Sequence, residues 1–252
     1  MKHTRVVAAL LVASACMASA NATEASEQIS AGYDHLSAGN LNGFSGRGDL
    51  LVSLSNPGLN IQLSGGDEHF DISGTSVDIA DISGSVFWRD RMGTFGATVA
   101  YHRLSAAVNF QGMHTNGAAT AESYGAFGEY YFNKSLTLRV KGGAFSGDFE
   151  GYYGGGGLAV YPSHNMAISA NYDYVSLKHG GHSSRPGASF EILPYEPWPA
   201  TVTVNYAREM EAGGYNVIGV VLKWHFGAYE NDLRAWDRAG PTQWTGALKV
   251  PL

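Results

Sequence analysis

Apolar and polar residues alternate along most of the chain, most clearly in its last regular segment, residues 215–226. The even positions of this segment from 218 onward are all apolar: Ile218, Val220, Leu222, Trp224 and Phe226. The odd positions are mixed and include Lys223 and His225, with Val217 and Val221 as apolar exceptions. A period of two places successive side chains on opposite faces of a β-strand. One face of this strand is therefore predicted to meet lipid or a core, and the other to meet water.

The same alternation predicts twelve strands, with ten as the alternative count. The expected ranges are 27–36, 44–55, 59–71, 77–89, 94–106, 121–132, 135–148, 152–162, 166–178, 187–195, 199–210 and 215–227. Tight turns are expected near 56–58, 90–93, 133–134, 163–165 and 196–198, where residues that favour bends gather. At the other end we expect longer loops, chiefly 107–120 and 179–186. Short turns at one end and longer loops at the other are typical of outer-membrane barrels, whose turns face the periplasm.

Charged residues inside the predicted strands fall on the polar face. Six of them are Glu129, Arg139, Lys141, Asp173, Glu209 and Lys223. A charge in hydrocarbon is costly, so we assign the polar face to the lumen and predict that these six side chains line it. A soluble β-sandwich alternates as well, but it buries its apolar face between two sheets, and it is the competing fold.

Aromatic residues on the apolar face are predicted to form two bands. The band near the short turns comprises Trp88, Phe95, Phe132, Trp224 and Phe226, and the band towards the loops comprises Tyr101, Tyr124, Tyr174 and Tyr206. Phe95 and Tyr101 are six residues apart, which is roughly 20 Å along a strand. Two rings of amphipathic side chains at this separation fit the two interfaces of a bilayer.

Over residues 27–227 the chain resembles the small, porin-like outer-membrane β-barrel proteins of Gram-negative bacteria, and residues 215–226 resemble the closing strand that those barrels present to the assembly machinery. The predicted fold is therefore all-β, an antiparallel up-and-down transmembrane barrel spanning residues 23–227. The resemblance implies residence in the outer membrane, contact with its lipid and insertion by the barrel-assembly machinery. The closing strand of such barrels usually ends the chain, whereas here residues 228–252 follow it.

The two ends of the chain carry separate predictions. Residues 1–22 read as a cleaved signal peptide with a basic start, a short apolar run and small residues before the cleavage site. Cys16, the only cysteine, falls within it, and its lipidation is the rival interpretation. Residues 228–252 are expected to form a periplasmic extension, a plug or a partner-binding segment, with a polar turn at 237–241.

Composition narrows the classes of function. Without Lys2 and Arg5 the 16 basic residues fall to 14 against 22 acidic ones, a net charge of −8. A nucleic-acid partner is not expected, because there is no basic stripe to neutralise phosphates. Only 15% of the residues are charged and 33 are glycine, which fits a barrel with a lipid-facing band.

Motifs that could carry chemistry are weak. His179 and His182 share a loop, but no third ligand is adjacent, so no metal or other cofactor is predicted. Arg47-Gly48-Asp49 lies within a predicted strand and is interpreted as a chance match to an integrin-binding tripeptide. No Gly-x-Ser-x-Gly nucleophile motif occurs, and His102 and His225 are expected to point into the lumen.

Three hypotheses of function follow. The first is a non-enzymatic, narrow, porin-like channel that passes small polar solutes along the charged lumen. The second is a structural or surface-interaction barrel with a closed lumen, whose loops 107–120 and 179–186 contact outside partners. The third is a barrel enzyme that modifies lipid, which needs a histidine within hydrogen-bonding reach of a serine and an oxyanion-binding group.

Overall fold

The computed structural model describes residues 24–37, 41–54, 58–72, 75–110, 113–195, 197–211, 214–227 and 232–240. The predicted signal peptide, with Cys16, lies outside these residues. The strands are β1 (Glu24–Leu36), β2 (Leu41–Ser53), β3 (Gly58–Ile72), β4 (Thr75–Arg89), β5 (Gly93–Phe110), β6 (Met113–Asn133), β7 (Leu136–Gly147), β8 (Gly151–Ser163), β9 (Met166–Leu177), β10 (Gly181–Ile192), β11 (Ala200–Arg208) and β12 (Asn216–Gly227). The helix α2 (Leu233–Ala239) follows them. It is not long and apolar enough to cross a membrane, and no other helix in the described part of the chain is either.

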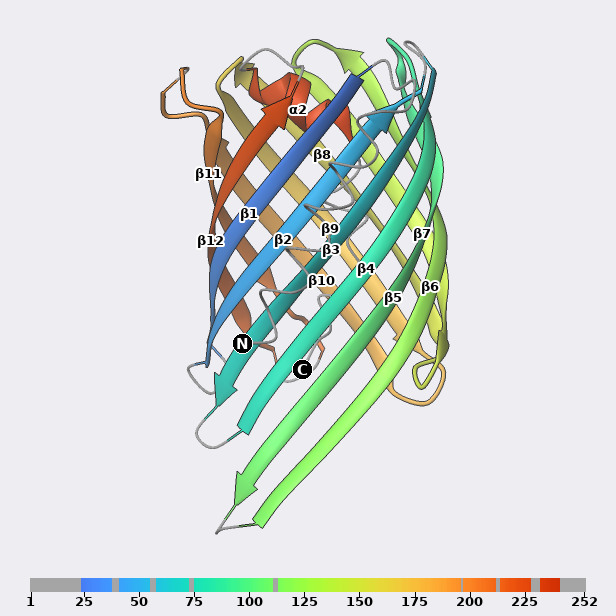
Figure 1. Ribbon diagram of the computed structural model, residues 1–252, viewed down its shortest axis with the longest axis vertical. Coiled ribbons are helices and arrows are strands. Elements are labelled where there is room, and N and C mark those ends of the chain that lie inside the picture. Colours follow the sequence, from blue (N-terminus) through green and yellow to red (C-terminus); the bar gives the residue numbers. More distant parts are fainter. Residues whose placement is uncertain are drawn as a thin grey trace.

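The strands close into one barrel (Figure 1). Each strand pairs antiparallel with its neighbours in the chain, and β1 pairs with β12 from Ser26↔Gly227 to Leu36↔Val217 to close the ring. Closure leaves no open sheet edge along this seam, which is what a sheet inside a bilayer requires. The predicted fold and its twelve strands are confirmed, and the alternative count of ten is wrong.

The burial of the side chains is the reverse of that in a soluble protein. On β7 the outward Leu138 and Val140 are 39% and 55% exposed, whereas Arg139 between them is 9% exposed. The apolar face of the alternating pattern is therefore the outer surface of the barrel and the polar face encloses the lumen. The competing soluble sandwich would require the opposite arrangement.

The tight turns form where short polar side chains can hold the backbone. Asp90 Oδ1 accepts hydrogen bonds from the backbone N–H groups of Met92 and Gly93, at 2.7 and 3.1 Å. Asn133 Oδ1 accepts one from Ser135 N at 2.7 Å. These local bonds replace the pairing that the backbone loses at a hairpin.

The opposite end of the barrel differs from the expectation. Residues 107–120 were expected to form a loop, but β5 and β6 continue as paired strands to Phe110↔Met113, and this hairpin projects beyond the rest of the barrel (Figure 1). The loop expected at 179–186 is also wrong, because β10 begins at Gly181 and pairs with β9 from there. Both segments are rich in small and polar residues, which local propensity assigns to loops, and the ladder hydrogen bonds of the neighbouring strand override that propensity.

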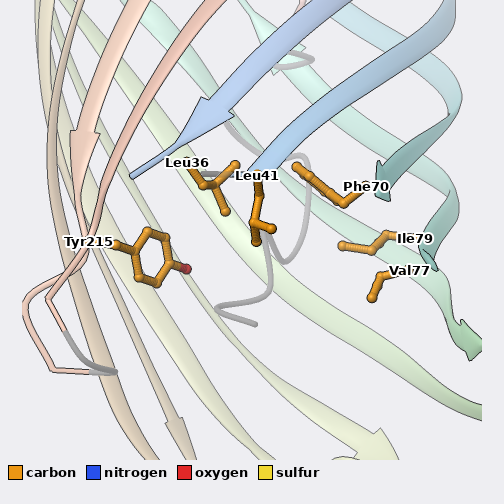
Figure 2. Packing of buried hydrophobic residues seen from close by; sticks show 6 residues of the cluster. All are labelled: Leu36, Leu41, Phe70, Val77, Ile79 and Tyr215. Carbon is orange, nitrogen blue, oxygen red and sulfur yellow. The ribbon is translucent and has the colours of Figure 1, made fainter. Parts of the chain in front are cut away.

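The inner face is not polar throughout. Near the loop end Leu36, Leu41, Phe70, Val77, Ile79 and Tyr215 form a buried apolar cluster. Figure 2 shows these side chains gathered on one side of the lumen, on β1 to β4 and the segment before β12. Apolar side chains therefore line part of the wall at this end.

The polar turn expected at 237–241 is wrong over its first residues, because Asp237, Arg238 and Ala239 form the last turn of α2. The helix starts after Asp232, whose side chain accepts a hydrogen bond from Ala235 N at 3.2 Å. This N-cap satisfies a free donor of the first turn. In Figure 1 α2 lies at the end of the barrel that carries the tight turns.

Candidate functional site

Ion pairs join side chains of different strands across the inner wall, and three of them reach over an intervening strand. The shortest N···O distances are 2.6 Å for Arg47–Asp81, 2.8 Å for Lys141–Asp173, 2.8 Å for Lys223–Glu191, 3.0 Å for Arg139–Glu129 and 3.5 Å for Arg185–Glu209. Each of these charges thus has a partner of opposite sign, and a buried charge without one would be costly.

All six charged residues predicted for the lumen lie on the inner wall, at different heights. Arg139 and Glu129 pair beneath α2, and Lys141, Asp173 and Lys223 line a central cavity. Glu209 is fully buried at the end of β11, where its carboxylate accepts a hydrogen bond from Ser183 at 2.7 Å. The pattern of the sequence indicates the inner face, but it does not indicate which residues pair.

The central cavity has a volume of about 390 Å³. Besides the ion pairs, neutral polar side chains line it, among them Ser169, Asn171, Ser189, Thr203 and Asn205. Thr203 Oγ1 and Arg185 Nε are buried without a hydrogen-bond partner in the described part of the chain. Buried polar atoms usually find a partner, so water or a polar solute in the cavity would complete these bonds.

Asp237 of α2 belongs to the lining of this cavity. Its carboxylate accepts hydrogen bonds from Arg139 and from the Tyr161 hydroxyl. Arg139 therefore links a carboxylate of β6 to one of α2. The ion pair between Arg139 and Asp237 was not predicted, because Asp237 lies 98 residues from Arg139 in the chain and was assigned to a turn.

The Arg238 side chain attaches α2 to strands β6, β7 and β8. Its guanidinium lies 4.5 Å from the ring centre of Tyr131 and 5.3 Å from that of Tyr161. It also donates to Thr137 Oγ1 at 3.0 Å and to the carbonyl of Asn133 at 2.8 Å. Cation–π contacts of this kind strengthen when water is excluded.

Apolar and stacking contacts complete the docking of α2. Leu233 is 2% exposed and packs with Ala159, Tyr161, Ala167 and Leu193. On the opposite wall Trp236 stacks on His225 of β12, with ring centres 4.1 Å apart and planes at 8°. Because β8 to β10 and β12 all contact it, α2 lies across the lumen at the short-turn end rather than outside the barrel. Of the three alternatives for the tail, a periplasmic extension, a plug or a partner-binding segment, the place of residues 233–239 in the barrel mouth fits the plug.

A second cavity, of about 310 Å³, lies beside the helix. Trp236, Ala239 and Gly240 line it on one side, and residues of β1, β2, β3 and β12 line it on the other. Gln28 lines both this cavity and the central one. The plug therefore leaves space along one wall.

Eight of the nine predicted interface aromatics are exposed on the outer surface: Trp88, Phe95, Tyr101, Tyr124, Phe132, Tyr206, Trp224 and Phe226. Tyr174 is partly buried, because its ring packs against Tyr152 and His182, with ring centres 6.4 and 6.3 Å apart. Tyr152, which is 57% exposed, takes the outermost position there and was missed by the sequence interpretation.

The remaining motifs contribute little to a site. His102 Nε2 lies 2.9 Å from Ser123 Oγ, but both are buried and neither belongs to the lining of the two cavities. His182 Nε2 lies 3.8 Å from Glu211, and in the described ranges no three His, Cys, Asp or Glu residues gather as metal ligands. Arg47 and Asp49 face the lumen, which removes the tripeptide they form with Gly48 from the outer surface.

At the loop end, outside the cavities, Lys178 pairs with Glu150 at 2.7 Å. The hydrogen bond from the ammonium, together with its charge, lowers the pKa of the Glu150 carboxyl. The pair is open to solvent, so its contribution to stability is small.

Comparison with known proteins identifies the fold but no family. No protein-family model and no curated protein matches the sequence. Among solved structures, the KdgM porin aligns with a TM-score of 0.58 at 9% identity over 79% of this chain and 99% of its own. The translocator domain of the autotransporter NalP from Neisseria meningitidis gives 0.53 at 13% identity over 89% and 96%. The NanC porin gives 0.52 at 9% identity over 78% and 98%. The chain thus has the fold of outer-membrane β-barrel proteins.

Proposed function

We propose that this protein is a non-enzymatic channel of the outer membrane that passes small polar solutes through a narrow lumen. The observation that carries the proposal is the central cavity of about 390 Å³, enclosed by a barrel with an apolar outer surface and lined by ion pairs and neutral polar groups. A polar passage with charged walls is how membrane pores select solutes.

The comparisons support the proposal at the level of the fold. Two of the similar structures are porins, KdgM and NanC, although the third is a translocator domain. Since twelve strands enclose more space than the roughly eight whose side chains fill the interior, the wall leaves room for solutes between its ion pairs. The exposed aromatic and aliphatic band, together with the outer-membrane barrels among the similar structures, supports an outer-membrane location.

Recording from the purified chain in planar lipid bilayers tests this function. We expect discrete conductance steps that are small, because α2 occupies part of one mouth. Folding is checked in the same preparation by the different gel mobility of unheated and boiled samples. A correctly folded barrel that gives no steps would refute the channel.

A structural barrel with a closed lumen is the second candidate, and the docking of α2 on opposite walls favours it. Replacing Arg238 by Ala removes the contacts with Tyr131 and Tyr161 and loosens the plug. If the natural chain gives no conductance steps and Arg238→Ala gives them, α2 closes the lumen of the natural chain and the second candidate is supported.

A further inference from the structure

The plug does not fill its end of the barrel evenly. Leu233 and Asp237 pack towards β7 to β10, whereas the cavity of about 310 Å³ lies between the helix and the strands that close the barrel, β12, β1, β2 and β3. A solute that passes α2 therefore has space on the side of β1.

Gln28 marks the junction between the two cavities, because it is part of both linings. Its neighbours across the sheet are His225 on β12 and Asp49 on β2, directly opposite in register. The Gln28 amide donates to Asp49 Oδ2 at 3.4 Å. Three inward side chains on adjacent strands thus lie in one row where the space narrows.

The row has unused hydrogen-bonding capacity. Asp49 and His225 are 7% and 8% exposed, and Asp49 Oδ1 and His225 Nε2 have no hydrogen-bond partner among the residues that the structure describes. Buried polar atoms without partners are costly, so their persistence beside a cavity indicates that water or a solute meets them.

The charge at the row is negative. No Lys or Arg belongs to the lining of the cavity beside the plug, and Asp49 is its inward carboxylate. The nearest cations on the same strands are Arg47 and Lys223; both act on Asp49 through their charge, but each forms its ion pair with another carboxylate, Asp81 and Glu191 respectively. Asp49 therefore offers a passing ion more attraction than the paired charges of the central cavity do.

We propose that solutes pass the plug along the β1 side, that Gln28 and Asp49 form the constriction, and that Asp49 makes the pore prefer small cations, including protonated amines, over anions. The inference rests on the proposed channel and adds its path and its selectivity. A single carboxylate at a narrow point acts on every ion that crosses it.

The test is the reversal potential of the full chain in bilayers that separate two concentrations of potassium chloride. We expect a preference for potassium that Asp49→Asn reduces by roughly fivefold, the factor for one unit charge a few ångströms from an ion in water. Gln28→Ala, which shortens the side chain at the junction, is expected to raise the single-channel conductance.

Two matched variants serve as controls. Glu150→Gln removes the same charge from the exposed loop end and should leave the reversal potential unchanged. Asn116→Ala shortens an exposed amide on β6, outside both cavities, and should leave the conductance unchanged. Gel mobility of unheated samples identifies any variant that does not fold. If one of the two variants, Asp49→Asn or Gln28→Ala, fails to fold, the other still tests the constriction.

The outcomes separate the inference from the proposed function. A natural chain that conducts without preferring potassium, or that responds to neither Asp49→Asn nor Gln28→Ala, overturns the constriction and leaves the channel standing. A folded chain that never conducts removes both.

Discussion

The charged residues of this barrel differ greatly in how much stability their removal should cost. Arg139 is buried and bridges two carboxylates, Glu129 and Asp237, whereas Lys178 at the loop end is 63% exposed in its pair with Glu150. A buried bridge leaves uncompensated charge when one partner is lost, and an exposed pair is replaced by water. Ion pairs in this barrel therefore cannot be treated as equivalent.

We expect Arg139→Leu to lower the free energy of unfolding by about 3–5 kcal/mol, because Glu129 and Asp237 then remain charged and buried. Lys178→Ala is the matched control and should leave it nearly unchanged, because the pair it removes is exposed to water. Urea titrations of the barrel in detergent micelles, followed by tryptophan fluorescence, measure both. Equal effects of the two substitutions would show that the bridge beneath α2 is not intact.

The sequence predicts the face of these residues but not their partners. Alternation places Lys223 inside, yet its partner Glu191 is 32 residues away on β10, with β11 between them. The pair depends on the register Glu191↔Thr203 and Thr201↔Lys223, which no local pattern specifies. Register is fixed by the whole sheet.

At the scale of elements, strands were predictable because a period of two extends over each of them. The hairpin of β5 and β6 was missed beyond residue 106, because Ala106, Ala107, Gly117, Ala118 and Ala119 carry little alternation. Their strand state comes from pairing such as Ala106↔Gly117. The helix α2 was missed for another reason, since seven residues are too few for a clear helical period.

So short a helix is held by its docking rather than by its own stability. Leu233 is its most buried side chain, at 2% exposure, and a buried Leu→Ala change costs about 2–5 kcal/mol. We therefore expect Leu233→Ala to undock α2 while the barrel stays folded. Trypsin should then cleave the tail after Arg234 and Arg238, which are largely covered in the natural chain.

Leu54→Ala is a suitable control, because Leu54 is 42% exposed at the end of β2. It should leave the tail as resistant to trypsin as in the natural chain. Mass spectrometry of the digestion products locates the cuts. Cleavage of the natural tail at the rate found for Leu233→Ala would mean that α2 does not reside in the barrel mouth.

For the molecule as a whole, stability depends on the seam between the first and last strands. The outer surface is apolar, so an opened seam would expose the hydrogen-bonding edges of β1 and β12 to lipid. We expect such a barrel to unfold cooperatively. Substitutions at the seam should lower its stability more than similar substitutions elsewhere in the wall.

Gly227 ends β12 at this seam, with φ of +116°, a conformation that side chains rarely adopt. A Cβ added there would also lie 2.5 Å from the carbonyl oxygen of Ala25 and 2.8 Å from Ser26 Cα, both in the backbone of β1. We expect Gly227→Ala to lower the free energy of unfolding by about 1–3 kcal/mol and to lower the temperature at which the unheated, compact band on a gel converts to the unfolded one.

Gly128→Ala is the control, because a Cβ there meets its nearest atoms at 3.7 and 3.8 Å, and its conversion temperature should stay the same or rise. If both variants convert at the natural temperature, the last pair of the seam, Ser26↔Gly227, contributes nothing to closure, and the barrel is held by the remaining pairs between Glu27 and Leu36.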